Sequence, residues 1–122
     1  MLKNAGIPNE KLFSSEDWND YSETANNAAE AFLRNDKEKL SEYLYDPNYD
    51  AGLSDNSENL FDVLDYSELI LIDGSVAEFE TGKVYPAVYK FALLDSDMLF
   101  FLDIGLRKTD ISWKVDYIYL QE

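Results

Sequence analysis

The sequence contains no cysteine and no histidine among its 122 residues. The absence of cysteine excludes disulfides, thiolate metal sites and cysteine nucleophiles, and it leaves the cellular compartment open. The absence of histidine excludes Ser-His-Asp and Cys-His nucleophile systems, histidine acid–base catalysis and imidazole metal ligands. Neither G-x-G-x-x-G nor the phosphate-binding G-x-x-x-x-G-K-[ST] occurs. We therefore predict no cofactor and no catalytic residue from sequence motifs.

Basic residues are also scarce, because 10 Lys and Arg stand against 25 Asp and Glu, which gives a formal net charge of −15. This charge opposes phosphate backbones and anionic membrane surfaces, so we expect no nucleic-acid binding. The negative charge favours solubility, and it would also attract a basic protein partner by electrostatic steering.

Long apolar runs are missing as well. No run approaches the roughly 18 apolar residues of a membrane span. Residues 1–14 lack the apolar stretch of an export signal. We therefore expect either a cytoplasmic protein or an extracytoplasmic mature domain from which the export signal has been removed.

Hydrophobic residues make up 46% of the chain and aromatic residues 15%, which favours a packed globule over a disordered acidic chain. The length predicts one domain. Gly6 and Pro8 predict an irregular N-terminal arm over residues 1–13, followed by a single domain over residues 14–122.

The C-terminal third of the chain predicts long strands at Val84–Leu94, Met98–Arg107 and Ile111–Gln121, separated by polar turns. Because side chains alternate between the faces of a strand, one face of each is strongly apolar. We assign to an inner face, covered by helices, Tyr85, Ala87, Tyr89, Phe91, Leu93, Met98, Phe100, Leu102, Ile104, Leu106, Ile111, Trp113, Val115, Tyr117 and Tyr119.

The outer face of these strands mixes charged and apolar residues. Asp103 and Asp116 fall there beside Lys90, Arg107 and Lys114, so cross-strand ion pairs are expected. The remaining apolar residues exceed what a solvated face needs, and they predict a second covering element or a homodimer through this outer sheet face.

Helices are predicted before the sheet. The first begins at Ser14 or Ser15 and carries one apolar stripe at helical spacing. Asp36 caps a second helix that is expected to run to about Tyr45. The apolar stripe of the first helix is Trp18, Tyr21, Ala25, Ala28 and Phe32.

The loop from Asp46 to Ser57 has the oxygen-rich composition of a calcium-binding loop. The spacing departs from that motif, since Ala51 stands where glycine is needed and Ser57 where glutamate is needed, with Glu58 one residue late. Calcium binding through a slipped loop and a solvated loop without metal both remain open.

If the loop binds no metal, Asp55 is expected to cap a short third helix near Leu60. A strand follows over Ser67–Ile72. The Asp73–Gly74 pair predicts a hairpin, and Val76–Glu80 is the expected return strand.

Two stretches carry a resemblance to a known family. Ala28–Leu40 is a small-residue helix with a short acidic break and a second helix, and Ser112–Ile118 is a strand with one tryptophan. Together with three helices followed by a curved antiparallel sheet, they resemble the nuclear transport factor 2-like superfamily of cystatin-like α+β proteins.

The resemblance implies a cone-shaped fold with an apolar pocket, and dimers through the outer sheet face. It implies no single activity, because its members include isomerases, dehydratases, ligand carriers, lipoprotein domains, immunity proteins and protein-binding modules. The isomerase type pairs a tyrosine with an aspartate that we cannot match here, and the dehydratase type needs histidine.

We therefore expect an α+β domain in which N-terminal helices pack on one face of a curved antiparallel sheet. The leading hypothesis is a non-catalytic domain that binds a small apolar ligand or a protein. The alternatives are a small lyase or isomerase that uses a buried carboxylate with a tyrosine, and an acidic immunity- or inhibitor-type protein that binds a basic partner. The pocket candidates, which could equally form a filled core, are Tyr21, Tyr85, Tyr89, Phe100, Trp113 and Tyr117.

Overall fold

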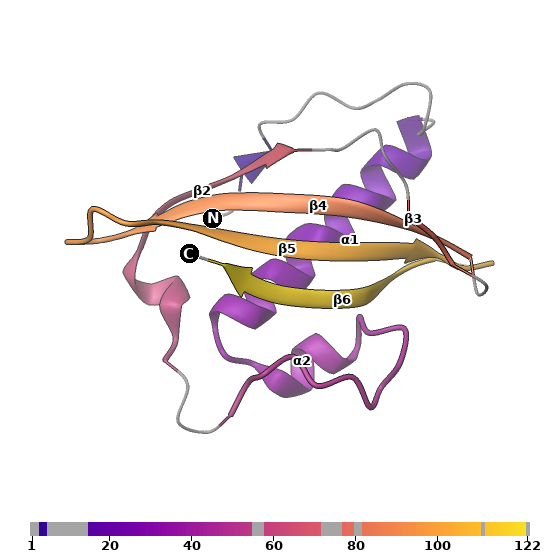
Figure 1. Cartoon of the computed structure of the whole chain (residues 1–122), viewed down its shortest axis with the longest axis horizontal. Coiled ribbons are helices and arrows are strands. Elements are labelled where there is room, and N and C mark those ends of the chain that lie inside the picture. Colours follow the sequence, from indigo (N-terminus) through magenta and orange to yellow (C-terminus); the bar gives the residue numbers. More distant parts are fainter. Residues whose placement is uncertain are drawn as a thin grey trace.

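The computed structural model describes residues 3–4, 15–54, 58–71, 77–79, 82–110 and 112–121. The predicted α+β class is confirmed: the N-terminal helices pack against a curved, largely antiparallel sheet (Figure 1). The elements in chain order are β1 (Lys3–Asn4), α1 (Ser15–Leu33), α2 (Lys37–Ser41), the 3-10 helix η1 (Leu60–Val63), β2 (Leu64–Leu71), β3 (Ala77–Phe79), β4 (Gly82–Leu93), β5 (Leu99–Lys108) and β6 (Trp113–Gln121).

The sheet has the strand order β1-β2-β4-β5-β6, and β3 also pairs with β4. β1 runs parallel to β2, and the other pairs are antiparallel. The expectation that residues 76–80 return along residues 67–72 is wrong, because both β2 and β3 pair with β4. β4 is 12 residues long, so its first residues pair with β3 and its residues from Val88 onward pair with β2. Asp73 and Gly74 lie outside the described residues.

The long predicted strands are confirmed as β4, β5 and β6, with ends that differ from the prediction by at most two residues. Asp95 lies in the turn between β4 and β5 and has a φ of 61°. Asp tolerates this left-handed conformation better than most residues, which accounts for the turn at this position.

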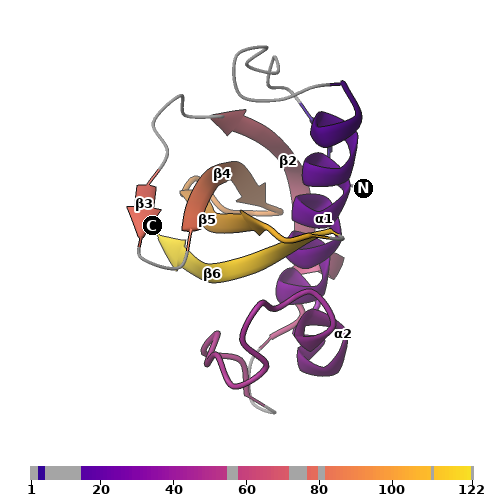
Figure 2. The same ribbon diagram turned by 90° about the vertical axis from the view of Figure 1, so that its right-hand side faces the viewer.

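Helix α1 crosses one face of the sheet and packs mainly on β5 and β6, while β3 lies on the opposite side (Figure 2). The predicted stripe faces this core, because Tyr21, Ala25 and Ala28 are fully buried. Alanines at the contact let the helix backbone approach the sheet closely. The helix gives way to Asn35, which has a φ of 59° and is followed by the predicted cap Asp36. The side chain of Trp18 lies outside the described part of the structure.

Helix α2 begins as predicted and ends early. The Oδ1 atom of Asp36 accepts a hydrogen bond of 3.0 Å from the amide of Lys39. The helix ends at Ser41 and not near Tyr45, because the segment after it pairs with β6. The amide of Tyr45 donates to the carbonyl of Val115 at 2.8 Å, and the amide of Val115 donates to the carbonyl of Tyr43 at 2.7 Å.

The third predicted helix is the 3-10 helix η1. Its cap is Asn59, whose side-chain oxygen accepts from the amides of Phe61 and Asp62. The cap of η1 is therefore Asn59 and not the predicted Asp55, which lies outside the described residues.

A β-bulge in β6 changes the face on which its side chains lie. Gly105 of β5 is opposite Tyr117, whereas the next residue, Leu106, is opposite Val115. Asp116 is therefore the extra residue, and alternation is reset beyond it. The assignment of Tyr117 and Tyr119 to the inner face is wrong: both lie on the outer face, and Ile118 enters the core with 1% of its surface exposed.

Candidate functional site

The predicted pocket residues nearest Trp113 are packed against one another. The ring of Trp113 meets those of Tyr21 and Tyr85 edge-on, with centroids 5.4 Å and 5.2 Å apart. Trp113 is 4% exposed, and Tyr21 and Tyr89 have no exposed surface. These side chains belong to the hydrophobic core between α1 and the sheet.

The buried tyrosine hydroxyls have hydrogen-bond partners. Tyr89 donates to the side-chain oxygen of Asn26 on α1, and Tyr21 donates to the backbone carbonyl of Pro86 on β4. Burial raises the pKa of both hydroxyls well above its ordinary value of 10. Both groups therefore stay protonated at pH 10, where an exposed tyrosine ionises, and they tie α1 to β4, which is a structural role.

The other pocket candidates lie elsewhere. Phe100 stacks on Phe91 with centroids 5.4 Å apart. Tyr85 borders a hollow of about 490 Å³ beside Lys108, the last residue of β5, and residues 109–110 of the turn that follows. Tyr117 is on the opposite face of the sheet. The structure thus brings Tyr21, Tyr85 and Trp113 together and separates Tyr117 from them.

The outer sheet face carries a group of residues that we call the acidic tyrosine cluster, namely Asp103, Tyr117 and Tyr119. The hydroxyl of Tyr119 donates to Oδ2 of Asp103 at 3.0 Å, and that of Tyr117 lies 3.4 Å from Oδ1. The two rings are 5.7 Å apart and inclined by 31°. Tyr119 is 45% exposed, so the cluster faces solvent. Partial burial and the nearby charge of Asp103 raise the pKa of Tyr117 to about 12.

Gly105 makes room for this cluster. A Cβ atom at Gly105 would lie 2.1 Å from the ring of Tyr117, so any side chain there would displace the ring. Glycine inside a strand is a known mark of a bulge or of close approach. Gly105 is the sequence signal that could have revealed the true face of Tyr117.

An ion pair lies beside the cluster. Nη2 of Arg107 is 2.9 Å from Oδ1 of Asp116, and the guanidinium lies over the ring of Tyr45 with 4.8 Å to its centroid. Arg107 is 6% exposed. The predicted cross-strand pairing of charge is confirmed for these two residues, and their role is structural.

An apolar groove of about 450 Å³ adjoins the cluster. Tyr119 belongs to both features. Phe32 at the end of α1, the loop around Leu53, Leu60 of η1 and Leu120 of β6 supply apolar surface, and Glu58 is the one charged residue among its described lining residues. Sequence reasoning missed this groove, because its walls come from four distant segments.

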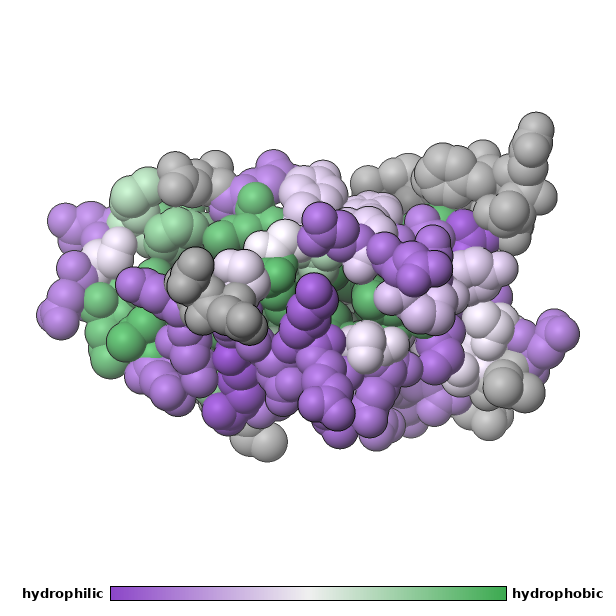
Figure 3. Space-filling view, turned by 90° about the horizontal axis from the view of Figure 1, so that it is seen from below, coloured by the Kyte–Doolittle hydropathy of each residue, from purple (hydrophilic) through white to green (hydrophobic). Residues whose placement is uncertain are grey.

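Exposed apolar side chains gather at the end of the molecule where β4 turns into β5. Figure 3 shows this apolar end at the left, next to a hydrophilic surface over α2. The exposed residues there are Val63, Leu94, Met98 and Leu99.

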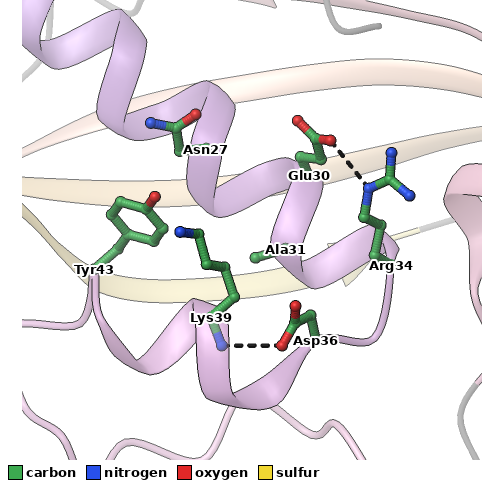
Figure 4. Close-up of a pocket in the computed structure, with 7 residues that line it drawn as sticks. All are labelled: Asn27, Glu30, Ala31, Arg34, Asp36, Lys39 and Tyr43. Atoms are coloured by element: carbon green, nitrogen blue, oxygen red, sulfur yellow. Dashed lines mark hydrogen bonds and ion pairs between the residues drawn. The ribbon is translucent and has the colours of Figure 1, made fainter.

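A pocket of about 230 Å³ between α1 and α2 has a charged lining (Figure 4). Arg34, directly after α1, pairs with Glu30 of α1 at 3.0 Å, and the side chain of Lys39 reaches from α2 towards α1 alongside Tyr43. The side chains of Arg34 and Lys39 are about half exposed. Exposed ion pairs of this kind add little stability, and the mixed signs match no single ligand charge.

The oxygen-rich loop uses its carboxylates to shape its own turns. Oδ1 of Asp46 accepts from the amide of Asn48 at 2.9 Å, and Oδ1 of Asp50 accepts from the amide of Gly52 at 2.8 Å. Among the described residues, no three acidic side chains come close enough together to hold a metal ion. The helices described here include none that is long and apolar enough to span a bilayer.

Comparison with known proteins gives no family. No protein-family model matches the sequence, and no curated protein matches it.

Proposed function

We propose that this protein is a non-catalytic binding domain for a basic protein partner. The observation that carries the proposal is the position of Tyr119, an exposed residue that lines an apolar groove and whose hydroxyl donates to the carboxylate of Asp103. Tyrosine is enriched in protein interfaces, because its ring supplies contact area and its hydroxyl supplies a hydrogen bond. The net charge of −15 steers basic partners towards the protein and repels acidic ones.

The enzymatic alternative finds less support. A lyase or isomerase of the expected type needs a carboxylate held in an apolar environment, where its pKa is raised. Among the Asp and Glu side chains that the structure describes, none is buried, and Asp103 and Asp116 are partly exposed. The buried tyrosines have hydrogen-bond partners within the core.

Membership of the nuclear transport factor 2-like superfamily remains a proposal, which rests on the order of the helices and strands. The expected homodimer through the outer sheet face also remains a prediction. It is the weaker alternative, since two chains of charge −15 repel each other before they meet. A basic partner has no such cost.

A selection from a random peptide library displayed on phage tests the proposal. We expect the selected peptides to be rich in Arg and Lys, and their binding to weaken as salt is raised. At one salt concentration, Tyr119→Ala and Asp103→Asn should each weaken the binding of these peptides. Asp65→Asn, at an exposed carboxylate of β2, is the matched control and should not. Selection of acidic or uncharged peptides, or of none, would contradict the proposal.

A further inference from the structure

The groove has the properties of a site for an apolar side chain. Its volume of about 450 Å³ falls within the range of roughly 300–1,000 Å³ of typical binding sites, which are mostly apolar with a few polar groups. Leu53, Leu60 and Leu120 supply the apolar surface, and Glu58 is the charged residue among the described lining residues. An apolar side chain buried there would gain free energy in proportion to the area removed from water.

Tyr119 of β6 belongs both to this apolar groove and to the acidic tyrosine cluster. One part of the residue lines the groove, and its hydroxyl donates to Oδ2 of Asp103 at 3.0 Å. The ring of Tyr117 lies 5.7 Å away on the same face. A cation that lies over these rings is attracted by their π-faces and by the carboxylate beyond them.

Resting on the proposed function, we infer that the partner binds through two neighbouring anchors: an apolar side chain in the groove and an arginine on the acidic tyrosine cluster. Arginine fits better than lysine, because its planar guanidinium stacks on aromatic rings and pairs with a carboxylate through two N–H groups. The partner is therefore a segment in which basic and apolar residues alternate or adjoin.

Charge decides between this occupant and a second copy of the chain. Glu58 at the groove and Asp103 at the cluster both favour a cation. A second copy on the same face would bring further carboxylates into this region, and like charges in an interface are unfavourable. A purely apolar ligand would gain nothing from Asp103.

Synthetic peptides test the inference with the full chain. Three acetylated hexapeptide amides are compared, with alternating Arg and Leu, alternating Arg and Ser, or alternating Glu and Leu. Binding is followed by NMR titration of the labelled protein at about 50 mM NaCl, where surface charges are only partly screened. We expect the Arg–Leu peptide to bind about tenfold more tightly than the Arg–Ser peptide, which corresponds to about 1.4 kcal/mol. The Glu–Leu peptide should not bind.

Two variants locate the apolar anchor. Leu120→Ser removes apolar surface from an exposed edge of the groove, and Ala51→Phe fills the groove from a loop. Each should abolish the preference for the Arg–Leu peptide over the Arg–Ser peptide. Leu99→Ser, at an exposed leucine outside the groove, is the matched control and should keep this preference.

The outcomes separate the inference from the proposed function. Equal binding of the Arg–Leu and Arg–Ser peptides, or a preference that survives both groove variants, would overturn the two-anchor site and leave a basic partner in place. Failure of both arginine peptides to bind would overturn the proposed function as well.

Discussion

The hydroxyls of Tyr21 and Tyr89 show what burial does to single residues in this protein. Burial raises the pKa of each above its ordinary value of 10, and the partly buried Tyr117 is raised to about 12. The unfolded chain releases these protons near pH 10, while the folded chain retains them. The contribution to stability is therefore complete below pH 10 and is lost as the pH rises above it.

We predict that the free energy of unfolding falls steeply above pH 10. Each of the fully buried tyrosines should contribute about 1.4 kcal/mol per pH unit to the slope. Urea unfolding at a series of pH values measures this dependence of the unfolding free energy on pH. Tyr89→Phe should reduce the slope, because phenylalanine has no hydroxyl that titrates. A stability that does not change above pH 10 would contradict this account.

The size of Trp113 leads to a second prediction. Its ring fills the space between Tyr21 and Tyr85 and is 4% exposed. Trp113→Ala should therefore lower the free energy of unfolding by about 3–5 kcal/mol, as large-to-small core changes do. Trp113→Phe, which keeps an aromatic ring, should cost less. If Trp113→Ala unfolds at the same urea concentration as the unchanged protein, the residue lines an open site.

Gly105 leads to a third prediction, because the ring of Tyr117 occupies the place of a side chain there. Gly105→Ala should destabilise the protein by about 1–3 kcal/mol, as overpacking does. The same change in a Tyr117→Ala background should cost much less, since the ring is gone. A double-mutant cycle by urea unfolding measures the coupling, and additive effects would show that the two residues do not touch.

At the scale of elements, the segment after α2 protects the outer edge of β6. Residues 43–45 pair with Val115, and the hydroxyl of Tyr49 both accepts from the amide and donates to the carbonyl of Ile118, at 3.2 Å each. Exposed strand edges invite pairing with other chains, and covering them prevents this.

We predict that Tyr49→Phe exposes this edge locally. Hydrogen exchange at the amide of Ile118 should become roughly five- to tenfold faster, because a net hydrogen bond contributes about 1 kcal/mol. Tyr66→Phe, at an exposed tyrosine on β2, is the control. Unchanged exchange at Ile118 would mean that the hydroxyl does not protect the edge.

The sequence predicted the long strands, the Asp36 cap and the buried stripe of α1, because each depends on local periodicity or on one side chain. It did not predict the bulge at Asp116, since the alternation of apolar and polar residues does not show where an extra residue shifts the following side chains to the other face. It also did not predict that β3 pairs with β4, because turn chemistry favours the nearest strand as partner. Helix α2 ended early because pairing with β6 outweighed its own propensity.

For the whole molecule, the unbalanced charge has a measurable cost. A net charge of −15 on a small protein causes repulsion between like charges. This repulsion is stronger in the compact folded state than in the unfolded state, so it lowers the stability of the fold. We predict that the urea concentration at the midpoint of unfolding rises as NaCl is increased, because salt screens this repulsion. The same urea titrations with an uncharged osmolyte in place of NaCl control for effects of the added solute other than charge screening. A midpoint that falls with salt would show that ion pairs such as Arg107–Asp116 outweigh the repulsion.

The candidate site could not be predicted from the sequence for a reason that applies to the whole molecule. Phe32, Leu60 and Leu120 are ordinary apolar residues in their own segments, and only tertiary packing brings them together. Tyr119 was recognised as part of a strand and was placed on the wrong face. The predicted pocket residues share an aromatic character, which is also typical of a filled core.

The packing of α1 on β5 and β6 also bears on how the chain is made. A ribosome completes α1 at Leu33 and begins β5 only at Leu99, so the helix emerges well before its partners exist. Its apolar stripe lacks its partners on β5 and β6 during that interval, which at about 5–20 residues per second lasts several seconds. Native packing of this helix therefore waits until the later strands have been synthesised, and a nascent chain that stalls before β5 presents an unprotected hydrophobic surface to chaperones and proteases.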